Sequence, residues 1–107
     1  SSGARAGLTA FLAGVAPQVA QHDVTINNLL PGLFDTDRLR GATQRAAEQT
    51  GRDEADIAAE RASAVPAGRF GNPVEFGETC AFLCSANAGY ITSQNLLIDG
   101  GRYPGTF

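Results

Sequence analysis

Apolar residues near the start of the chain recur with the spacing of one helical face, at Leu8, Phe11, Leu12, Val15 and Val19. This pattern predicts a helix that ends near residues 22–23. The next stretch, residues 24–30, is rich in β-branched side chains and stops at Pro31-Gly32, which predicts a strand. A helix that leads into a short strand and a Pro-Gly turn indicates an α/β unit.

Residues 33–64 are polar or alanine-rich and predict two helices with a break between them. Asp35 or Thr36 can cap the first of these helices, and Gly51 can end it. Asp53 can cap the second. Because each alanine side chain buries little area, we expect this helix pair to be a mobile segment that covers a site and not part of the core.

The last third of the chain predicts one more helix and a final strand. Asn72-Pro73-Val74-Glu75 combines a capping residue, a first-position proline and a third-position glutamate, which is typical of a helix start. Strand character follows at residues 90–92 and 95–98 and stops at Asp99-Gly100-Gly101. We expect Tyr90 to pack between this helix and the last strand.

The predicted order is therefore helix, strand, helix, helix, helix, strand, which places the chain in the α/β class. Two strands do not make a stable sheet alone, and parallel sheets are normally multi-stranded and covered on both faces. We therefore expect a further part of the same domain to precede Ser1.

Composition narrows the function classes. The chain has 107 residues with 43% apolar and 18% charged residues and a net charge of −3, which is typical of a globular protein and not of a nucleic-acid or anionic-membrane binder. It has no lysine, which excludes lysine Schiff-base chemistry on this chain. No apolar run is long enough to span a bilayer, and no signal peptide is visible.

Cys80 and Cys84 are four residues apart in a helical pattern, a poor geometry for a disulfide. A reduced, cytoplasmic protein is the simplest interpretation. With one histidine in the chain and no acidic cluster nearby, we expect these cysteines to be buried core residues, and we predict no metal site.

Three segments of the chain carry short motifs in a fixed order. Residues 24–36 form a strand followed by P-G-x-x-x-T, and residues 69–75 read R-x-G-x-P-x-E. Residues 82–101 read F-L-x-S, then Y-I-T-G-Q with Ser93 in place of the glycine, then D-G-G. Each segment is weak alone, but in this order and spacing they are specific and cover nearly the whole chain. Together they resemble the C-terminal part of the short-chain dehydrogenase/reductase family, and they do not name a substrate.

This resemblance implies a Rossmann-like doubly wound parallel sheet that binds NAD or NADP, mainly through the missing N-terminal part. It implies that Pro31 and Gly32 bring the backbone close to the nicotinamide. The Leu33 amide and the Thr36 hydroxyl would hold the carboxamide, and residues 33–64 would form the substrate lid. A turn followed by a helix cap would explain Gly32 and Thr36 without a cofactor.

The first helix departs from the family pattern. The family's catalytic tyrosine and lysine fall on Ser1 and Arg5 when the helix is aligned by its spacing to Pro31-Gly32. A serine hydroxyl is a far weaker acid than a phenol, whereas arginine keeps the positive charge in a different shape. No glycine-rich phosphate loop is present, because Gly3 and Gly7 form only a G-x-x-x-G pattern inside a helix.

Two functions therefore stay open. In the first, the chain is part of an NAD(P)-dependent oxidoreductase, similar to 3-oxoacyl reductases, that acts on a carbonyl or alcohol substrate. The chain alone would then be inactive. The resemblance also implies a homodimer or homotetramer that assembles through the helix at residues 4–20 and through Tyr103 and Phe107. The alternative is a non-catalytic relative that binds a cofactor or ligand and has lost the chemistry.

Overall fold

The computed structural model describes residues 2–105, and Ser1 and Phe107 lie outside the described residues. The elements follow the predicted order: α1 (Ser2–Val19), a 3-10 helix (Ala20–His22), β1 (Asn28–Pro31), α2 (Asp37–Thr50), α3 (Glu54–Ser63), α4 (Pro73–Leu83), a second 3-10 helix (Ala86–Ala88) and β2 (Asn95–Ile98). The described residues fall into two compact units, residues 2–30 with 78–96 and residues 31–77 with 97–105.

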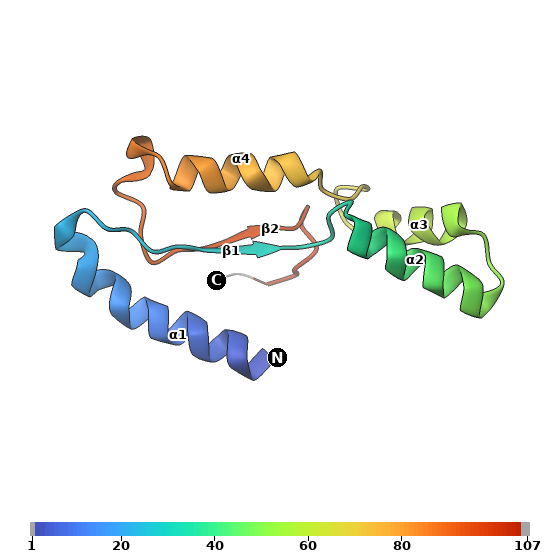
Figure 1. Ribbon diagram of the computed structural model, residues 1–107, viewed down its shortest axis with the longest axis horizontal. Coiled ribbons are helices and arrows are strands. Elements are labelled where there is room, and N and C mark those ends of the chain that lie inside the picture. Colours follow the sequence, from blue (N-terminus) through green and yellow to red (C-terminus); the bar gives the residue numbers. More distant parts are fainter. Residues whose placement is uncertain (1, 106–107) are drawn as a thin grey trace. The chain divides into compact units, whose positions relative to one another are not determined.

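β1 and β2 are hydrogen-bonded neighbours in a two-stranded sheet (Figure 1). The Asn28 amide donates to the Gln94 carbonyl at 2.8 Å, and the Gly32 amide donates to the Ile98 carbonyl at 2.9 Å. The sequence offset between partners is the same at both ends, so the strands run parallel. The predicted α/β class is therefore confirmed.

The strands are shorter than predicted, because polar side chains replace the backbone ladder at residues 24–27 and 90–92. The Asn27 amide group donates to the Ile91 carbonyl at 3.0 Å, while its side-chain oxygen accepts from the Gln94 amide at 3.0 Å. The Ile26 amide donates to Thr92 Oγ1 at 3.1 Å. These bonds join the two segments without regular strand pairing.

The predicted packing of Tyr90 is wrong. Its side chain is fully exposed, whereas Ala88 two residues earlier is buried in the same connection. Tyr90 follows the second 3-10 helix in a turn that directs its ring away from the described residues.

In the first unit, α1 and the second half of α4 lie on opposite faces of the strand segments (Figure 1). Both helices expose large apolar side chains, among them Phe11 and Phe82. The buried apolar residues of the described chain are Ala16, Ile57, Val65 and Ala88. None of the helices that the structure describes is long and apolar enough to cross a membrane.

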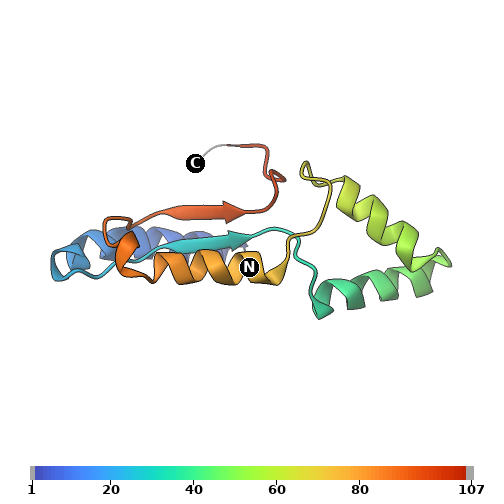
Figure 2. The ribbon, with the colours of Figure 1, turned by 90° about the horizontal axis from the view of Figure 1, so that it is seen from above.

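In the second unit, α2 and α3 form a helical hairpin (Figure 2). The helix ends lie where the sequence predicts them. Thr36 Oγ1 accepts from the Leu39 amide at 3.2 Å, Gly51 ends α2 in the left-handed region with φ of 69°, and Asp53 caps α3 through the Ala55 amide at 2.7 Å.

Ser93 lies in the left-handed region, with φ of 60°, where the resemblance led us to expect glycine. Its amide donates to the Ile26 carbonyl at 2.7 Å, so the turn cannot relax without losing that bond. Residues with a Cβ are disfavoured in this conformation by roughly 1–2 kcal/mol, whereas glycine adopts it freely.

We expect Ser93→Gly to raise the free energy of unfolding by about 0.5–1 kcal/mol, since the relief of strain outweighs the added flexibility of the unfolded chain. Urea unfolding of the full-length gene product measures this difference. Ser85→Gly, at a φ of −89°, is the matched control and should lower stability instead. If the Ser93→Gly variant is no more stable than the original protein, the backbone at Ser93 is not strained.

Candidate functional site

The predicted cofactor loop lies in the second unit, directly after β1. β1 ends at Pro31, and Thr36 begins the turn into α2 with φ of −119° and ψ of 164°. The hydroxyl oxygen of Thr36 accepts from the Leu39 amide, which leaves the hydroxyl hydrogen available to donate elsewhere. The loop is therefore held at one end by the sheet and at the other by a helix cap.

Gly32 approaches the end of β2 more closely than any other residue type could. A Cβ added to Gly32 would lie 2.6 Å from the Cβ and 2.7 Å from the Cα of Asp99. Its φ is not positive, so glycine is needed here for the close approach and not for an unusual backbone conformation. The side chain of Asp99 is fixed in turn, because it accepts from the amides of Gly101 and Tyr103, each at 2.9 Å.

The middle of the loop is attached to the segment before α4. Phe34 and Gly71 form an isolated parallel bridge. In it the Gly71 amide donates to the Leu33 carbonyl and the Asp35 amide donates to the Gly71 carbonyl, both at 2.9 Å. The bridge occupies the Leu33 carbonyl and leaves the Leu33 amide out of the pairing.

The segment before α4 is built around an ion pair. Arg69 Nη1 and Nη2 donate to the two carboxylate oxygens of Glu75 at 2.8 and 3.1 Å, and the Asn72 amide donates to Glu75 Oε1 at 2.9 Å. Hydrogen bonding from Arg69, and secondarily from Asn72, lowers the pKa of Glu75 to about 2 from its ordinary value of 4.5. A depressed carboxyl pKa stabilises the fold above the ordinary value, and this contribution is lost as the pH falls toward 2.

A cavity of about 290 Å³ lies beside the loop, entirely within the second unit. Its walls come from the loop, from the segment before α4 and from the end of β2, and include Leu33, Phe34, Arg69, Glu75 and Asp99. The loop itself offers a backbone amide at Leu33 and a hydroxyl at Thr36, and its one carboxylate, Asp35, is paired with Arg40 at 2.9 Å. It can hold a polar group, and it needs other residues for proton transfer.

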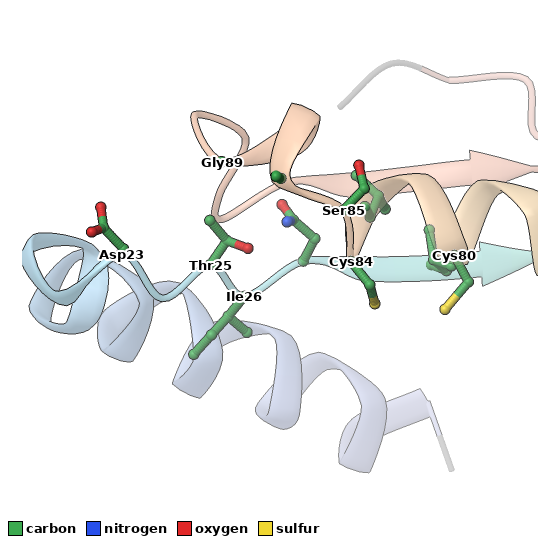
Figure 3. Close-up of a pocket in the computed structure, with 11 residues that line it drawn as sticks. Asp23, Thr25, Ile26, Cys80, Cys84, Ser85 and Gly89 are labelled. Atoms are coloured by element: carbon green, nitrogen blue, oxygen red, sulfur yellow. The ribbon is translucent and has the colours of Figure 1, made fainter.

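A larger cleft of about 860 Å³ lies in the first unit, between residues 23–29 and the C-terminal end of α4 (Figure 3). Cys80 and Cys84 line it and are exposed free thiols, so the prediction that they are buried core residues is wrong for the described chain. Apolar Ile26, Leu29 and Leu83 share the cleft, which indicates an uncovered packing surface more than a catalytic pocket.

The two predicted catalytic residues belong to the start of the chain, and the loop belongs to the second unit. Ser1 lies outside the described residues, and Arg5 is an exposed residue in the first turns of α1, in the other unit. The Arg5 carbonyl accepts from Thr9 Oγ1 at 2.9 Å, a bond internal to the helix. The four predicted cofactor-loop residues, Pro31, Gly32, Leu33 and Thr36, do lie together in one loop.

Sequence reasoning missed the residues that hold this loop. Gly71 and Asp99 were assigned only as parts of matched segments, yet Gly71 pairs with the loop and Asp99 packs against Gly32. A glycine in each of two segments far apart in sequence was the available signal for close backbone approach.

The family model described as enoyl-(acyl carrier protein) reductase matches residues 2–102. The chain belongs to the short-chain dehydrogenase/reductase family. Among relatives in this family, 3-oxoacyl-(acyl-carrier-protein) reductase FabG from Vibrio harveyi is 36% identical over 94% of this chain and 36% of its own length. Carbonyl reductase family member 4 from Danio rerio is also 36% identical, over 94% of this chain and 35% of its own length.

Solved structures of the family have the same fold. L-sorbose reductase from Gluconobacter frateurii, complexed with NADPH and L-sorbose, matches with a TM-score of 0.86 and 26% identity over 94% of this chain and 39% of its own. An apo short chain oxidoreductase from Pseudomonas aeruginosa, described as containing an atypical catalytic center, matches with a TM-score of 0.80 and 30% identity over 98% of this chain and 40% of its own. The predicted Rossmann-like α/β fold is thus confirmed, and the chain spans about two fifths or less of these relatives.

Proposed function

We propose that this chain is the C-terminal part of an NAD(P)-dependent oxidoreductase that interconverts a carbonyl and an alcohol on a small molecule. The observation that carries the proposal is the match of residues 2–102 to a reductase family together with a loop, residues 31–36, held from both sides at the end of a parallel strand. The carboxyl end of a parallel strand is where open α/β sheets bind their ligands. Relatives that reduce 3-oxoacyl groups favour a 3-oxoacyl-type substrate.

The loop fits a nicotinamide carboxamide chemically. A carboxamide carries one acceptor oxygen and a donor amino group. The Leu33 amide, outside the Gly71 bridge, is a donor for the carboxamide oxygen, and the Thr36 hydroxyl, after accepting from Leu39, keeps a second lone pair that can accept from the amino group. When bound, NAD or NADP supplies or accepts the hydride, and the role of this chain is to bind and orient the nicotinamide ring.

Arg5 and Ser1 stand where the family has lysine and tyrosine. We propose that Arg5 supplies the positive charge of the lysine, which binds the ribose and favours the ionised form of a neighbouring acid. Ser1 is too weak an acid to replace a phenol, so proton transfer requires a residue upstream of this chain or a water held there. A Pseudomonas aeruginosa short chain oxidoreductase described as containing an atypical catalytic center supports the view that this fold accepts a departure from the usual catalytic pattern.

The wider organisation follows from the same proposal. Residues 1–107 would be part of a single Rossmann-like domain, whose remaining strands cover the apolar cleft beside Cys80 and Cys84. Residues 33–64 would form the substrate lid, and the exposed apolar side of α1, with Leu8 and Phe11, would assemble a homodimer or homotetramer. Free cysteines agree with a cytoplasmic location.

The full-length gene product tests the function. We expect it to bind NADH or NADPH, seen as enhanced nicotinamide fluorescence, and to oxidise that cofactor in the presence of a 3-oxoacyl thioester or another carbonyl compound. The 107-residue chain by itself is the control and is expected to show neither activity. A full-length protein that binds neither cofactor would overturn the proposal.

The non-catalytic alternative rests on the serine at the position of the family tyrosine. It predicts that the full-length protein binds the cofactor but shows no turnover across a panel of carbonyl and alcohol substrates. Arg5→Ala then distinguishes the two functions further, because it should weaken cofactor binding in either case but change turnover only in an enzyme.

A further inference from the structure

The backbone of the loop at Leu33–Asp35 is paired with Gly71 through the isolated bridge. The bridge uses the carbonyl of Leu33 and the amide of Asp35, so it fixes the two peptide planes that flank Phe34. The direction of the Leu33 amide is set by the backbone torsions next to these planes. A shift of Gly71 would therefore reorient the donor that faces the proposed nicotinamide.

Gly71 is held against the loop from two sides. The ring of Phe34 packs edge-on against Phe76 at the start of α4, with ring centroids 5.7 Å apart and an interplanar angle of 85°. A Cβ added to Gly71 would lie 2.6 Å from Cε1 of Phe34, so no larger residue fits between this ring and the backbone. The ring and the bridge together fix the distance between the loop and the start of α4.

The start of α4 is fixed in turn by Arg69 and Glu75. Their carboxylate–guanidinium contact is bidentate, Arg69 Nη1 also donates to the Phe70 carbonyl at 3.1 Å, and Glu75 accepts from the Asn72 amide. These bonds close the chain from residue 69 to residue 75 into a ring that contains Gly71. The Arg69 and Glu75 side chains are 60% and 47% exposed, so the pair adds little to global stability.

We propose that Arg69, Gly71 and Glu75 are positioning residues that hold Leu33–Thr36 in the conformation that receives the nicotinamide. The proposal rests on the proposed cofactor function and assigns these three residues a role that acts through the loop. Its distinctive expectation is a loss of cofactor affinity that is large compared with the loss of stability, because an exposed pair that fixes local geometry affects binding more than folding.

Glu75→Gln in the full-length gene product is the most specific test. Glutamine keeps an acceptor for the Asn72 amide, so the helix start survives, but it removes the charge that pairs with Arg69. We expect the dissociation constant for NADPH or NADH to rise about three- to tenfold, with a thermal midpoint within a few degrees of the original protein. Hydrogen exchange of the Leu33–Asp35 amides, measured without cofactor, should be about fivefold faster.

Glu78→Gln is the matched control, since Glu78 is an exposed glutamate of the same helix that takes no part in the ring of bonds. It should change neither the dissociation constant nor the exchange rates. If Glu75→Gln fails to fold, Arg69→Lys replaces it, because lysine keeps the charge but cannot make the bidentate contact.

The outcomes separate this proposal from the function on which it rests. If the unmodified full-length protein binds neither NADH nor NADPH, the cofactor function fails before any variant is compared. If it binds one of them, and the variant binds it equally well with unchanged exchange at Leu33–Asp35, the positioning role is overturned and the function stands. If Glu75→Gln and Glu78→Gln lose cofactor affinity equally, the positioning role is also overturned. Removal of any negative charge from α4 would then explain the effect.

Discussion

Gly32→Ala is expected to destabilise the full-length protein by about 3 kcal/mol and to weaken NADPH or NADH binding by more than about tenfold. The added methyl group would meet the Cα and Cβ of Asp99 at 2.7 and 2.6 Å. Because one of these atoms is backbone, no change of side-chain rotamer can relieve the contact. The end of β2 or the loop must move, which breaks the bond between the Gly32 amide and the Ile98 carbonyl.

Denaturant unfolding measures the loss of stability, and nicotinamide fluorescence measures the loss of affinity. Gly41→Ala is the matched control, since an added Cβ there would meet only the end of the Arg45 side chain at 3.5 Å, within a helix where alanine is preferred. That variant should be neutral or slightly more stable. A Gly32→Ala protein with unchanged stability would show that the loop and β2 are not closely packed.

Asn27→Ala is expected to cost about 2 kcal/mol of stability, the second largest effect. The Asn27 side chain donates to the Ile91 carbonyl and accepts from the Gln94 amide, both at 3.0 Å, across a separation of more than sixty residues in sequence. Alanine leaves the partly buried Ile91 carbonyl and the exposed Gln94 amide without these partners, and the partly buried group accounts for most of the expected cost. The entry into the two strands would then be held by backbone bonds, by Thr92 and by the bond between the Asn28 and Asn95 side chains.

Thermal or urea unfolding of the full-length protein detects this loss. Asn87→Ala is the control, because Asn87 is exposed in the connection before β2 and its replacement should change stability by less than about 0.5 kcal/mol. Cofactor affinity should fall much less in Asn27→Ala than in Gly32→Ala, since Asn27 lies in the unit that does not contain the loop. Equal stability of the two asparagine variants would refute the bridging role.

These two variants and Glu75→Gln each test a different structural role. Asn27 holds the start of the strand pair, Gly32 sets the distance between the loop and β2, and Glu75 is proposed to orient the loop without much effect on folding. The ratio of affinity loss to stability loss should therefore rise from Asn27→Ala to Glu75→Gln. That order distinguishes a site whose geometry depends on packing from a site whose geometry depends on the local Arg69–Glu75 contact.

The sequence by itself determined the helix boundaries, because capping depends on atoms within a few residues of one another. Asn72 and Glu75 cap α4 in the predicted way, Thr36 caps α2, and Gly51 ends it. The order of elements and the α/β class also followed from local patterns. The family followed from three short segments at the expected spacing, and the reductase family model matches nearly the whole chain.

The tertiary structure decided everything that depends on contacts between distant residues. The strand between residues 24 and 30 was predicted from β-branched composition, but pairing begins only at Asn28, because Asn27 and Thr92 use side chains where a ladder was expected. Cys80 and Tyr90 were predicted to be packed and are exposed, since burial depends on which other segments cover a helix and not on the helix's own pattern.

The same distinction applies to the site. The local sequence predicted that residues 31–36 form a turn with a helix cap. A glycine has no side chain, so the sequence does not indicate which residues pack against it. Only the fold shows that Gly32 lies against Asp99 and that Gly71 pairs with Phe34. Close backbone approach is a property of two segments at once, so neither segment determines it alone.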